Sequence, residues 1–350
     1  MSTVIGVDLG GTKVALATLH DRELSDSTTE PTDRSGARAL IEQLVRMIDA
    51  AKPERLDAVG VGVPSVVQFE DGMVVSSVNV PLADVPLRRV LSDRLSLPVF
   101  VDNDATVAAL AEAHDEQLNL VTRDLVMLTV GTGVGGGLIL GGRIYRGATG
   151  GAGELGHTIV GMDISGMLPT PTRFPQPGSL EYVAAGHALD RAAAEVAQEN
   201  PDSVLGHRHE EGKPVLGADA VRAAQEGDAA AARVVEIWGE RVGVGVANAI
   251  NTFDPEEVVI GGGAARAGEL VLEPAQRVAR GYVLPGVGER TTVRLARHGV
   301  QAGVLGAALL ARQELEDEGA AFDQLTGEDG RESGGTVESR KGAADEQAGS

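Results

Sequence analysis

The residues best suited to chemistry lie in one stretch, from Leu125 to His157, where glycines and two polar side chains follow an apolar run. That run ends at a turn of Gly131, Thr132 and Gly133. Such a turn directs several backbone N–H groups into one concavity, which binds phosphate without any lysine. Glu154 and His157 stand three residues apart in a second glycine-rich loop, and both side chains hydrogen-bond hydroxyl groups. The stretch is therefore suited to bind phosphate at one end and hydroxyl groups at the other. In the alternative interpretation, the glycines serve only to form tight turns and bind no ligand.

The same glycines spell GxGxxG between Gly131 and Gly136, which is the pattern of a dinucleotide-binding loop. In that loop the glycines must open a helix. Here they lead into two short apolar runs on either side of Gly141-Gly142, which is typical of a β-hairpin. The sequence therefore favours a hairpin and argues against a Rossmann fold.

A second glycine turn lies near the N-terminus, between strands predicted at 4–9 and 14–19, and it consists of Gly10, Gly11, Thr12 and Lys13. It lacks the GxxxxGK[ST] pattern and the following helix of a Walker A loop. The turn offers N–H groups to a ligand, and an ordinary glycine hairpin is the alternative. Asp8, at the end of the first strand, could hold Mg²⁺ through water or stabilise the turn, and both interpretations stay open here.

Polar residues also close the strand predicted at 98–104, just before a strong helix former at 105–113. Asp104 stands where an N-cap is expected, and capping alone would explain this one carboxylate. It does not explain why Asp102, Asn103 and Asp104 occur together. A third glycine turn, formed by Gly261, Gly262 and Gly263, follows a strand predicted from Asp254, and is a candidate phosphate or nucleotide loop.

The elements that must position these groups alternate between strand and helix patterns, which indicates an α/β protein. Its 350 residues, 43% of them hydrophobic, are enough for one or two domains with a core. From residue 314 onward the chain is acidic and poor in apolar residues, which predicts a disordered tail. Further helices are predicted at 37–51, 87–95, 218–225, 229–253 and 303–312, and further strands at 56–65 and 291–295.

Composition excludes several classes of protein. A formal net charge of −21 argues against nucleic acid or an anionic membrane as a partner. With no cysteine, the chain has no disulfide, no thiolate metal site and no cysteine nucleophile, which fits a reducing compartment. The sequence shows no apolar run long enough to span a membrane and no signal-like start. A cytoplasmic location is expected.

Together these motifs resemble the ROK family of sugar kinases, within the superfamily of actin-like, hexokinase-like ATPases, over residues 3–312. Five motifs occur in the family's order: Asp8 to Lys13 (DLGGTK), Gly62 to Pro64 (GVP), Asn103-Asp104, Gly131 to His157 (GTGVGG and GELGH), and Asp254-Pro255 with Gly261 to Gly263. The resemblance implies a two-lobed, ribonuclease H-like α/β fold that closes on ATP and sugar. Residues 1–120 and 299–313 would form the small lobe, 121–298 the large lobe, and 314–350 an acidic disordered tail.

Carried over residue by residue, the resemblance makes Asp104 the base that accepts a proton from a sugar hydroxyl, usually the one on C6. The residues implied to bind sugar are Ser65, Asn79, Asn103, Asp104, Glu154, His157 and Glu181. Those implied to bind nucleotide are Asp8, Gly10, Gly11, Thr12, Lys13, Gly131, Thr132, Gly133, Gly261, Gly262 and Gly263, with Asp8 holding Mg²⁺ through water. Phosphoryl transfer needs this kind of positioning, with N–H groups or cations where charge gathers on the phosphate.

The sequence departs from the family at the loop after His157. ROK kinases usually carry a Cys-x-Cys-x4-Cys zinc motif there, whereas residues 160–178 contain no cysteine, so no zinc is expected. Without the metal, His157 is expected to act on the sugar alone, and a purely structural histidine remains the alternative. Ser65 also stands where a glycine is common in the family.

The sequence therefore predicts an ATP- and Mg²⁺-dependent hexose kinase that makes the 6-phosphate, with glucose as the expected sugar and a homodimer as the expected assembly. Fructokinase, mannokinase and N-acetylmannosamine kinase are alternatives within the enzyme class, and polyphosphate is an alternative donor. A sugar-responsive regulator would need a DNA-binding domain ahead of the first glycine hairpin, and here that hairpin's strand begins at Thr3. A sugar-binding module without catalysis is the third alternative.

Overall fold

The computed structural model describes residues 2–77, 79–163, 165, 170–171 and 173–326. The chain separates into two compact units, residues 1–314 and 315–350. All the predicted site residues belong to the first unit. Within it, two β-sheets each carry a hydrophobic core of their own, and the division into two lobes at residues 120 and 299 remains a prediction.

The first sheet contains both strands of the N-terminal glycine hairpin. Its strands lie in the order β3 (Glu23–Leu24), β2 (Lys13–His20), β1 (Thr3–Leu9), β5 (Ala58–Val63) and β9 (Val99–Asn103), and β4 (Thr28–Pro31) also pairs with β2. β1 and β2 are antiparallel, whereas β1, β5 and β9 are parallel. The carboxyl ends of these three parallel strands therefore meet at one edge. A separate three-stranded sheet follows β5 and consists of β6 (Ser65–Gln68), β7 (Met73–Ser77) and β8 (Val85–Pro86).

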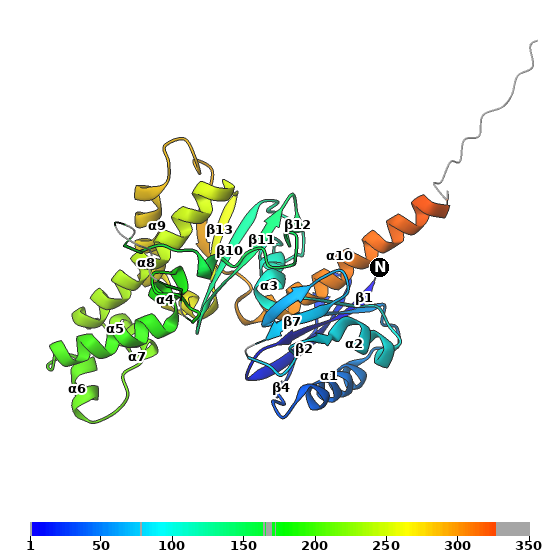
Figure 1. Ribbon diagram of the computed structural model, residues 1–350, viewed down its shortest axis with the longest axis horizontal. Helices are drawn as coiled ribbons and strands as arrows, with labels where there is room; N and C mark the ends of the chain where they lie inside the picture. The colour runs from blue at the N-terminus through cyan, green and yellow to red at the C-terminus, as the bar shows by residue number, and fades with distance from the viewer. Residues whose placement is uncertain (1, 78, 164, 166–169, 172, 327–350) are drawn as a thin grey trace, which may run out of the picture. The chain divides into compact units, whose positions relative to one another are not determined.

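Alternating residues of the first sheet pack against helices on opposite faces. Ile5, Val7 and Leu9 join a core with α1 (Ala37–Ala51) and α2 (Leu87–Leu95). Figure 1 shows these two helices beside the first sheet. Gly6 and Gly60 point the other way and lie against the backbone of α10 (Ala302–Thr326). Because neither glycine has a side chain, α10 approaches the strands closely. α3 (Asp104–Glu112) also contacts β5 and β9.

Changing Gly60 to alanine is expected to lower the free energy of unfolding by about 1 to 3 kcal/mol, because the added methyl group would overlap the carbonyl oxygen of Ala307 in α10. Urea denaturation would measure the loss. Gly281→Ala is the matched control, since it adds the same methyl group near the end of α9 (Glu269–Tyr282) with no atom within 4 Å. Equal stability of the two variants would contradict this account of the close packing.

The second sheet carries the other two glycine turns. Its order is β12 (Arg143–Ile144), β11 (Val134–Leu140), β10 (Leu125–Val130), β13 (Glu257–Gly261) and β14 (Thr292–Leu295). β10 and β11 pair antiparallel from Leu125 with Ile139 to Val130 with Val134. β11 and β12 pair antiparallel on either side of Gly141-Gly142, so the hairpin predicted there is confirmed. The Rossmann alternative fails, because the glycines after β10 lead into a strand and not into a helix.

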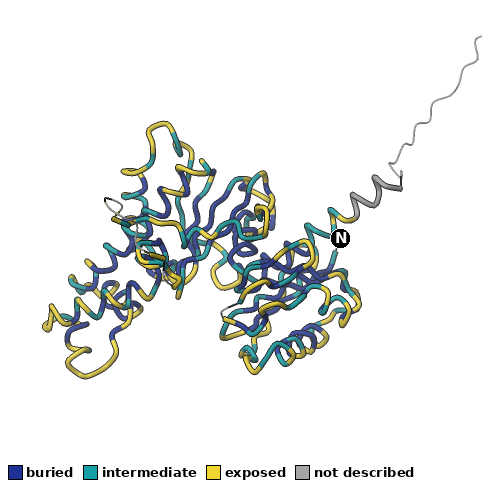
Figure 2. Tube along the Cα trace, in the orientation of Figure 1, coloured by how far each residue is buried: buried dark blue, intermediate teal, exposed yellow. Residues whose placement is uncertain are grey.

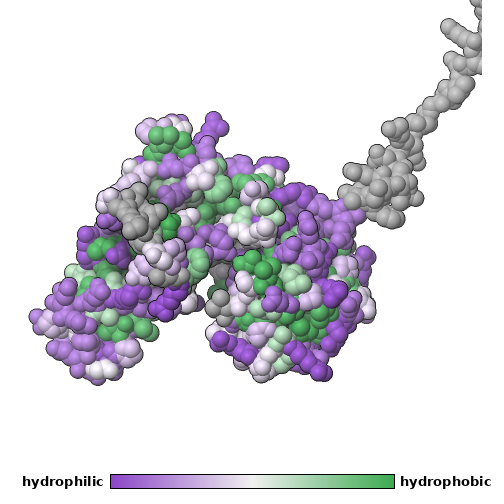
Figure 3. Space-filling model, viewed as in Figure 1, coloured by the Kyte–Doolittle hydropathy of each residue, from purple (hydrophilic) through white to green (hydrophobic). Residues whose placement is uncertain are grey.

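Helices α8 (Ala229–Phe253) and α9 pack against each other and against the second sheet, whose central strands are buried in Figure 2. α5 (Gly186–Glu199), α6 (Val204–Glu210) and α7 (Gly217–Gln225) gather at one end of α8 in Figure 1. The remaining short elements are α4 (Leu180–Ala184) and the 3₁₀ helices η1 (Leu155–His157), η2 (Gly262–Ala267) and η3 (Gly299–Gln301). On the face shown in Figure 3, hydrophilic residues dominate the described surface.

The structure differs most from the sequence predictions at α9 and at the end of the last helix. α9 was not predicted, because Pro274 lies inside it and reads as a helix breaker. The last helix was expected to end at Arg312, yet α10 continues to Thr326, so residues 314–326 are helical where disorder was expected. The rest of the acidic tail, 327–350, lies outside the described residues. Among the described helices, none is both long and apolar enough to cross a membrane.

Candidate active site

The site begins where β1, β5 and β9 end. Asp8 pairs in register with Gly62, and Gly62 pairs with Asp102 on its other side. A Cβ atom built on Gly62 would lie 2.7 Å from Val107 Cγ2 and 3.5 Å from the Cα atom of Asp104. The missing side chain therefore lets the first turn of α3 lie directly against the end of β5, which brings Asp104 to the edge occupied by Asp8.

Asn103, and not Asp104, is the N-cap of α3. Its Oδ1 accepts hydrogen bonds from the N–H groups of Ala105 at 2.9 Å and Thr106 at 3.1 Å. Asp104 is the first helical residue, and one of its oxygens accepts from the Ala105 N–H at 2.8 Å. The capping explanation of Asp104 was wrong, because its neighbour fills that role. The Asn103 amide also donates to the Ser65 carbonyl at 3.3 Å, so both ends of this side chain hold local structure.

The electrostatics of Asp8 and Asp104 favour their protonated forms. Burial raises the pKa of Asp8 to about 6, the negative charge of Asp104 adds to this, and Lys13 opposes it. Burial is also the main cause that raises the pKa of Asp104; the Ala105 N–H opposes it and the charge of Glu154 adds to it. Carboxylates that face one another in a desolvated place are typical of sites that bind a cation or move a proton.

Replacing Asp8 with asparagine is expected to stabilise the fold at pH 7.5. The native pKa of about 6 lies above the ordinary value of 3.8, so the stability linked to this group is present below pH 3.8 and is lost as the pH rises through 6. At pH 7.5 the wild-type protein carries that cost, up to about 3 kcal/mol, and the asparagine variant does not. Urea denaturation at pH 7.5 and at pH 4.5 checks this.

The gain from Asp8→Asn should shrink at the lower pH, where the wild-type carboxyl binds its proton. Asp26→Asn, which changes an exposed aspartate, should leave stability nearly unchanged at both pH values. A loss of stability in Asp8→Asn at pH 7.5 would show that the Asp8 charge is well solvated or paired, contrary to this description.

Glu154 and His157 lie at the ends of the short turn formed by η1. Glu154 Oε2 and His157 Nε2 are 3.7 Å apart. Glu154 is also close enough to Asp104 for its negative charge to help raise the pKa of Asp104. The structure therefore brings Glu154 and Asp104 together, with His157 beside Glu154. The edge of the Phe174 ring meets the His157 ring, with centroids 5.2 Å apart. The Nδ1 atom of His157 is buried and has no hydrogen-bond partner among the described residues.

Ser65 and Asn79 lie at the edge of this group. Ser65 Oγ and Ser77 Oγ are 2.8 Å apart, and the Ser77 hydroxyl donates to the Val80 carbonyl at 2.8 Å. Asn79 is exposed and lies against the first glycine turn, since a Cβ atom built on Gly11 would be 3.3 Å from its Cβ. A contact of either residue with sugar remains a prediction.

Each hairpin turn closes with one internal hydrogen bond. The Gly10 N–H donates to the Lys13 carbonyl, and the Gly131 N–H donates to the Gly133 carbonyl, each at 2.9 Å. Gly263 lies beside the second of these turns, with its N atom 4.0 Å from a Cβ atom built on Gly131. The structure thus brings the turns at Gly131 and Gly261–Gly263 together, as a shared nucleotide site requires.

Glu181 is directed at the second hairpin. Its Oε2 accepts from the Val134 N–H at 2.8 Å and lies 2.5 Å from a Cβ atom built on Gly133. The sequence placed this residue among the sugar ligands. Here the side chain binds the turn that was predicted to hold phosphate, so a sugar contact would require Glu181 to leave the Val134 N–H.

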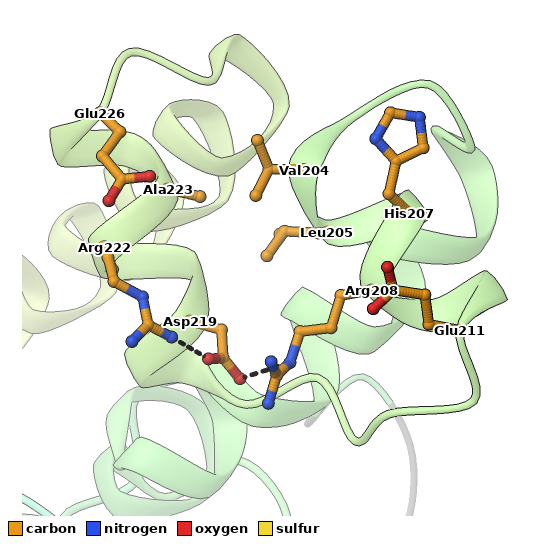
Figure 4. Close-up of a pocket in the computed structure, with 9 residues that line it drawn as sticks. All are labelled: Val204, Leu205, His207, Arg208, Glu211, Asp219, Arg222, Ala223 and Glu226. Carbon is orange, nitrogen blue, oxygen red and sulfur yellow. Dashed lines mark hydrogen bonds and ion pairs between the residues drawn. The ribbon is translucent and has the colours of Figure 1, made fainter.

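A surface pocket of about 360 Å³ lies apart from these groups, between α6 and α7 (Figure 4). Along its lining, Asp219 lies between Arg208 and Arg222 and forms ion pairs with both (Figure 4). The described residues that line it include none of the predicted site residues, and its buried carboxylate is already paired. We assign it no role. Its lining consists of Val204, Leu205, His207, Arg208, Glu211, Asp219, Arg222, Ala223 and Glu226.

Known proteins resemble this chain over most of its length. A glucokinase of Halalkalibacterium halodurans is 33% identical over 321 residues, covering 89% of this chain and 95% of that protein. An N-acetyl-D-glucosamine kinase of Citrobacter koseri is 34% identical and covers 87% of this chain and 98% of its own length. The crystal structure of a ROK family glucokinase from Streptomyces griseus, in complex with glucose and AMPPNP, is 30% identical with a TM-score of 0.73, over 89% of this chain and all of that one.

The family model matches almost the whole first unit. It is described as the ROK family and covers residues 4–314. The two sheets with their helices, and the similarity to the Streptomyces griseus structure, show the actin-like ATPase, hexokinase-like α/β fold. This protein belongs to the ROK family.

Proposed function

We propose that this protein is an ATP-dependent hexose kinase that transfers the γ-phosphoryl group to the 6-hydroxyl, with glucose as its main sugar. One observation carries the proposal: Asp104 begins α3 beside Asp8 and Glu154, in a place where burial raises its pKa. A raised pKa makes a carboxylate a stronger base for a hydroxyl proton. The glucokinase relatives support the choice of sugar.

In this proposal the protein's own groups position the reactants. Glu154, His157 and Asn103 would hydrogen-bond the sugar hydroxyls, and Asp104 would accept the proton of the attacking hydroxyl through its carboxylate. The N–H groups of the turns at Gly10 and Gly131 would hold the phosphates, with Gly261 to Gly263 close to the second turn. Such positioning and charge stabilisation suffice for phosphoryl transfer, and no covalent intermediate on the protein is needed.

Asp8 fits a role with Mg²⁺. Its desolvated carboxylate has a raised pKa, which a nearby cation would offset. No group of three potential metal-binding side chains occurs among the described residues. Mg²⁺ usually keeps several water ligands and is bound through one or two carboxylates together with the phosphates of the substrate. Bound Mg²⁺ would neutralise charge on the phosphates of ATP, and Asp8 would hold it through water.

N-acetyl-D-glucosamine is the second candidate sugar, because a relative that is 34% identical bears that name. Glucose, N-acetylglucosamine, mannose, fructose and N-acetylmannosamine would be compared with ATP in an assay that couples ADP formation to NADH oxidation. We expect the highest kcat/KM for glucose. A higher value for another sugar would reassign the substrate, and sugar binding without ADP formation would favour a sensing role.

Parallel reactions with polyphosphate test the donor, and size-exclusion chromatography tests the predicted homodimer.

A further inference from the structure

Arg146 connects three segments that carry predicted sugar contacts. We propose that it is a positioning residue, which fixes the loop of residues 146–157 against the strand end that carries Asp104, and so aligns the sugar with the base. The inference rests on the proposed hexose kinase activity. Neither the family resemblance nor the glycine patterns pointed to this residue.

The first segment is the end of β9. Asp102 is buried, with 2% of its side chain exposed, and both of its oxygens are engaged. Oδ2 accepts from Arg146 Nε at 2.7 Å, while Oδ1 accepts from the Asn103 N–H at 2.9 Å. One carboxylate therefore ties Arg146 to the backbone just before Asp104. This answers why three polar residues occur together at this strand end: Asp102 pairs with Arg146, Asn103 caps α3, and Asp104 remains for chemistry.

The second segment is the hairpin of β6 and β7, which begins with Ser65. The guanidinium carbon of Arg146 lies 3.4 Å from the centroid of the Phe69 ring, in the turn of that hairpin. Gly150, with φ +83°, lies on the same hairpin, because a side chain there would overlap the Val67 carbonyl. The planar guanidinium stacks on the ring while its edge bonds to carboxylates, and a lysine ammonium cannot reproduce both contacts.

The third segment is the loop itself. Arg146 is its first residue, and its carbonyl accepts from the Ala152 N–H at 3.1 Å, which closes the turn before Glu154. A Cβ atom built on Gly153 would lie 2.9 Å from the Gly136 carbonyl, so the far part of the loop rests on β11. Arg146 Nη2 also donates to Glu314 in α10 at 3.0 Å. The guanidinium thus anchors the start of the loop from two sides, and Glu154 and His157 follow from that fixed start.

A purely structural ion pair and a positioning residue have different consequences. Removing Arg146 leaves Asp102 buried and unpaired, so stability falls in either case. If Arg146 positions the loop, its removal also moves Glu154 and His157 away from the sugar hydroxyls. It then moves Asp104 away from the hydroxyl that attacks the phosphate. A displacement of about 1 Å in such a site costs up to roughly 100-fold in rate. The kinetic parameters for sugar therefore distinguish the two roles.

The experiment measures kcat and KM for the sugar and for ATP in Arg146→Met, Arg146→Lys, Asp102→Asn and the double variant Asp102→Asn/Arg146→Met. We expect Arg146→Met to raise the sugar KM and lower kcat, with kcat/KM for sugar down roughly 10- to 100-fold. The KM for ATP should change less than the sugar KM, because the partners of Arg146, namely Asp102, Phe69 and Glu314, lie outside the three glycine turns. Arg146→Lys should recover part of the loss through Asp102.

The double variant tests whether the two residues act through one bond. Because Asp102 and Arg146 would fix the same geometry, its loss should be close to that of the more damaging single variant and well short of the product of both. Arg94→Met removes an exposed pair with Glu42 on α1 and α2 and should leave every parameter unchanged. Arg294→Met, which breaks a buried pair with Glu112, should lower stability and leave the sugar KM unchanged.

A wild-type sugar KM and kcat in Arg146→Met and Asp102→Asn would overturn the inference, even if both variants lost stability. Losses that multiply in the double variant would also overturn it, because the residues would then act separately. If the wild-type protein phosphorylates none of the sugars, the proposed function fails first. The wild-type reaction alone therefore distinguishes failure of the proposed function from failure of the inference about Arg146.

Discussion

Asp104→Asn is expected to lower kcat by roughly 10²- to 10⁴-fold, the usual contribution of a general base, which corresponds to about 3 to 5 kcal/mol of barrier. The asparagine keeps the shape of the side chain and its hydrogen bond with the Ala105 N–H. It cannot accept the proton of the sugar hydroxyl. The sugar KM should change much less than kcat, since a neutral amide still hydrogen-bonds a hydroxyl.

The control for this variant is Asp93→Asn, which changes an exposed aspartate on α2. It should retain wild-type kcat. The capping of α3 belongs to Asn103, so Asp104→Asn should also unfold at nearly the wild-type temperature or above it, because burial disfavours the Asp104 charge. Wild-type turnover in Asp104→Asn would remove Asp104 from the role of base.

The second large effect is on stability. Arg294→Met is expected to lower the free energy of unfolding by about 3 to 5 kcal/mol, because it removes the closer of the two cations that pair with a buried carboxylate and leaves only Arg297, at 3.9 Å. The partner, Glu112, is fully buried at the end of α3, and Arg294 donates to it at 2.7 Å. Arg294 also pairs with Glu257 at 2.6 Å. Denaturation by urea at neutral pH measures the loss.

Glu112 also binds the backbone of the segment before α10. It accepts from the backbone N–H groups of Arg297 and His298, each at 2.9 Å, on the segment that leads into α10. The helix that begins at Asp104 therefore ends on a carboxylate that fixes the approach to α10. Arg233→Met, at an exposed pair with Glu236, should cost under about 1 kcal/mol. If Arg294→Met and Arg233→Met lose similar amounts of unfolding free energy, this account is contradicted. The charge of Glu112 would then be stabilised by water or by other groups when Arg294 is absent.

Much of the fold follows from local patterns in the sequence. The hairpins at Gly10 and at Gly141-Gly142 were predicted because apolar runs flank each glycine turn, and both are present. The helix at 229–253 was predicted at its observed bounds, since the pattern is long and strongly helical. The helix containing Pro274 was missed, because its packing against α8 outweighs the local cost of the proline.

The site was less predictable than the fold, since it depends on contacts between distant segments. Asp104 and Glu154 were selected from motifs, and the structure brings them together. The N-cap was misplaced by one residue, from Asn103 to Asp104, because both residue types cap helices well. Nothing local could show that Glu181 binds the Val134 N–H across 47 residues of chain. Arg146 was missed for the same reason. Its only signal was an arginine placed at the start of a glycine-rich loop, and its meaning depends on Asp102 and Phe69.

The most direct test of the central claim is a ³¹P NMR spectrum of the wild-type protein with ATP, Mg²⁺ and glucose. The proposed function predicts equal amounts of ADP and of a phosphate ester whose phosphorus couples to the two protons on C6 of the sugar. ADP that appears with inorganic phosphate, an ester on another carbon, or unchanged ATP at every hexose would contradict it.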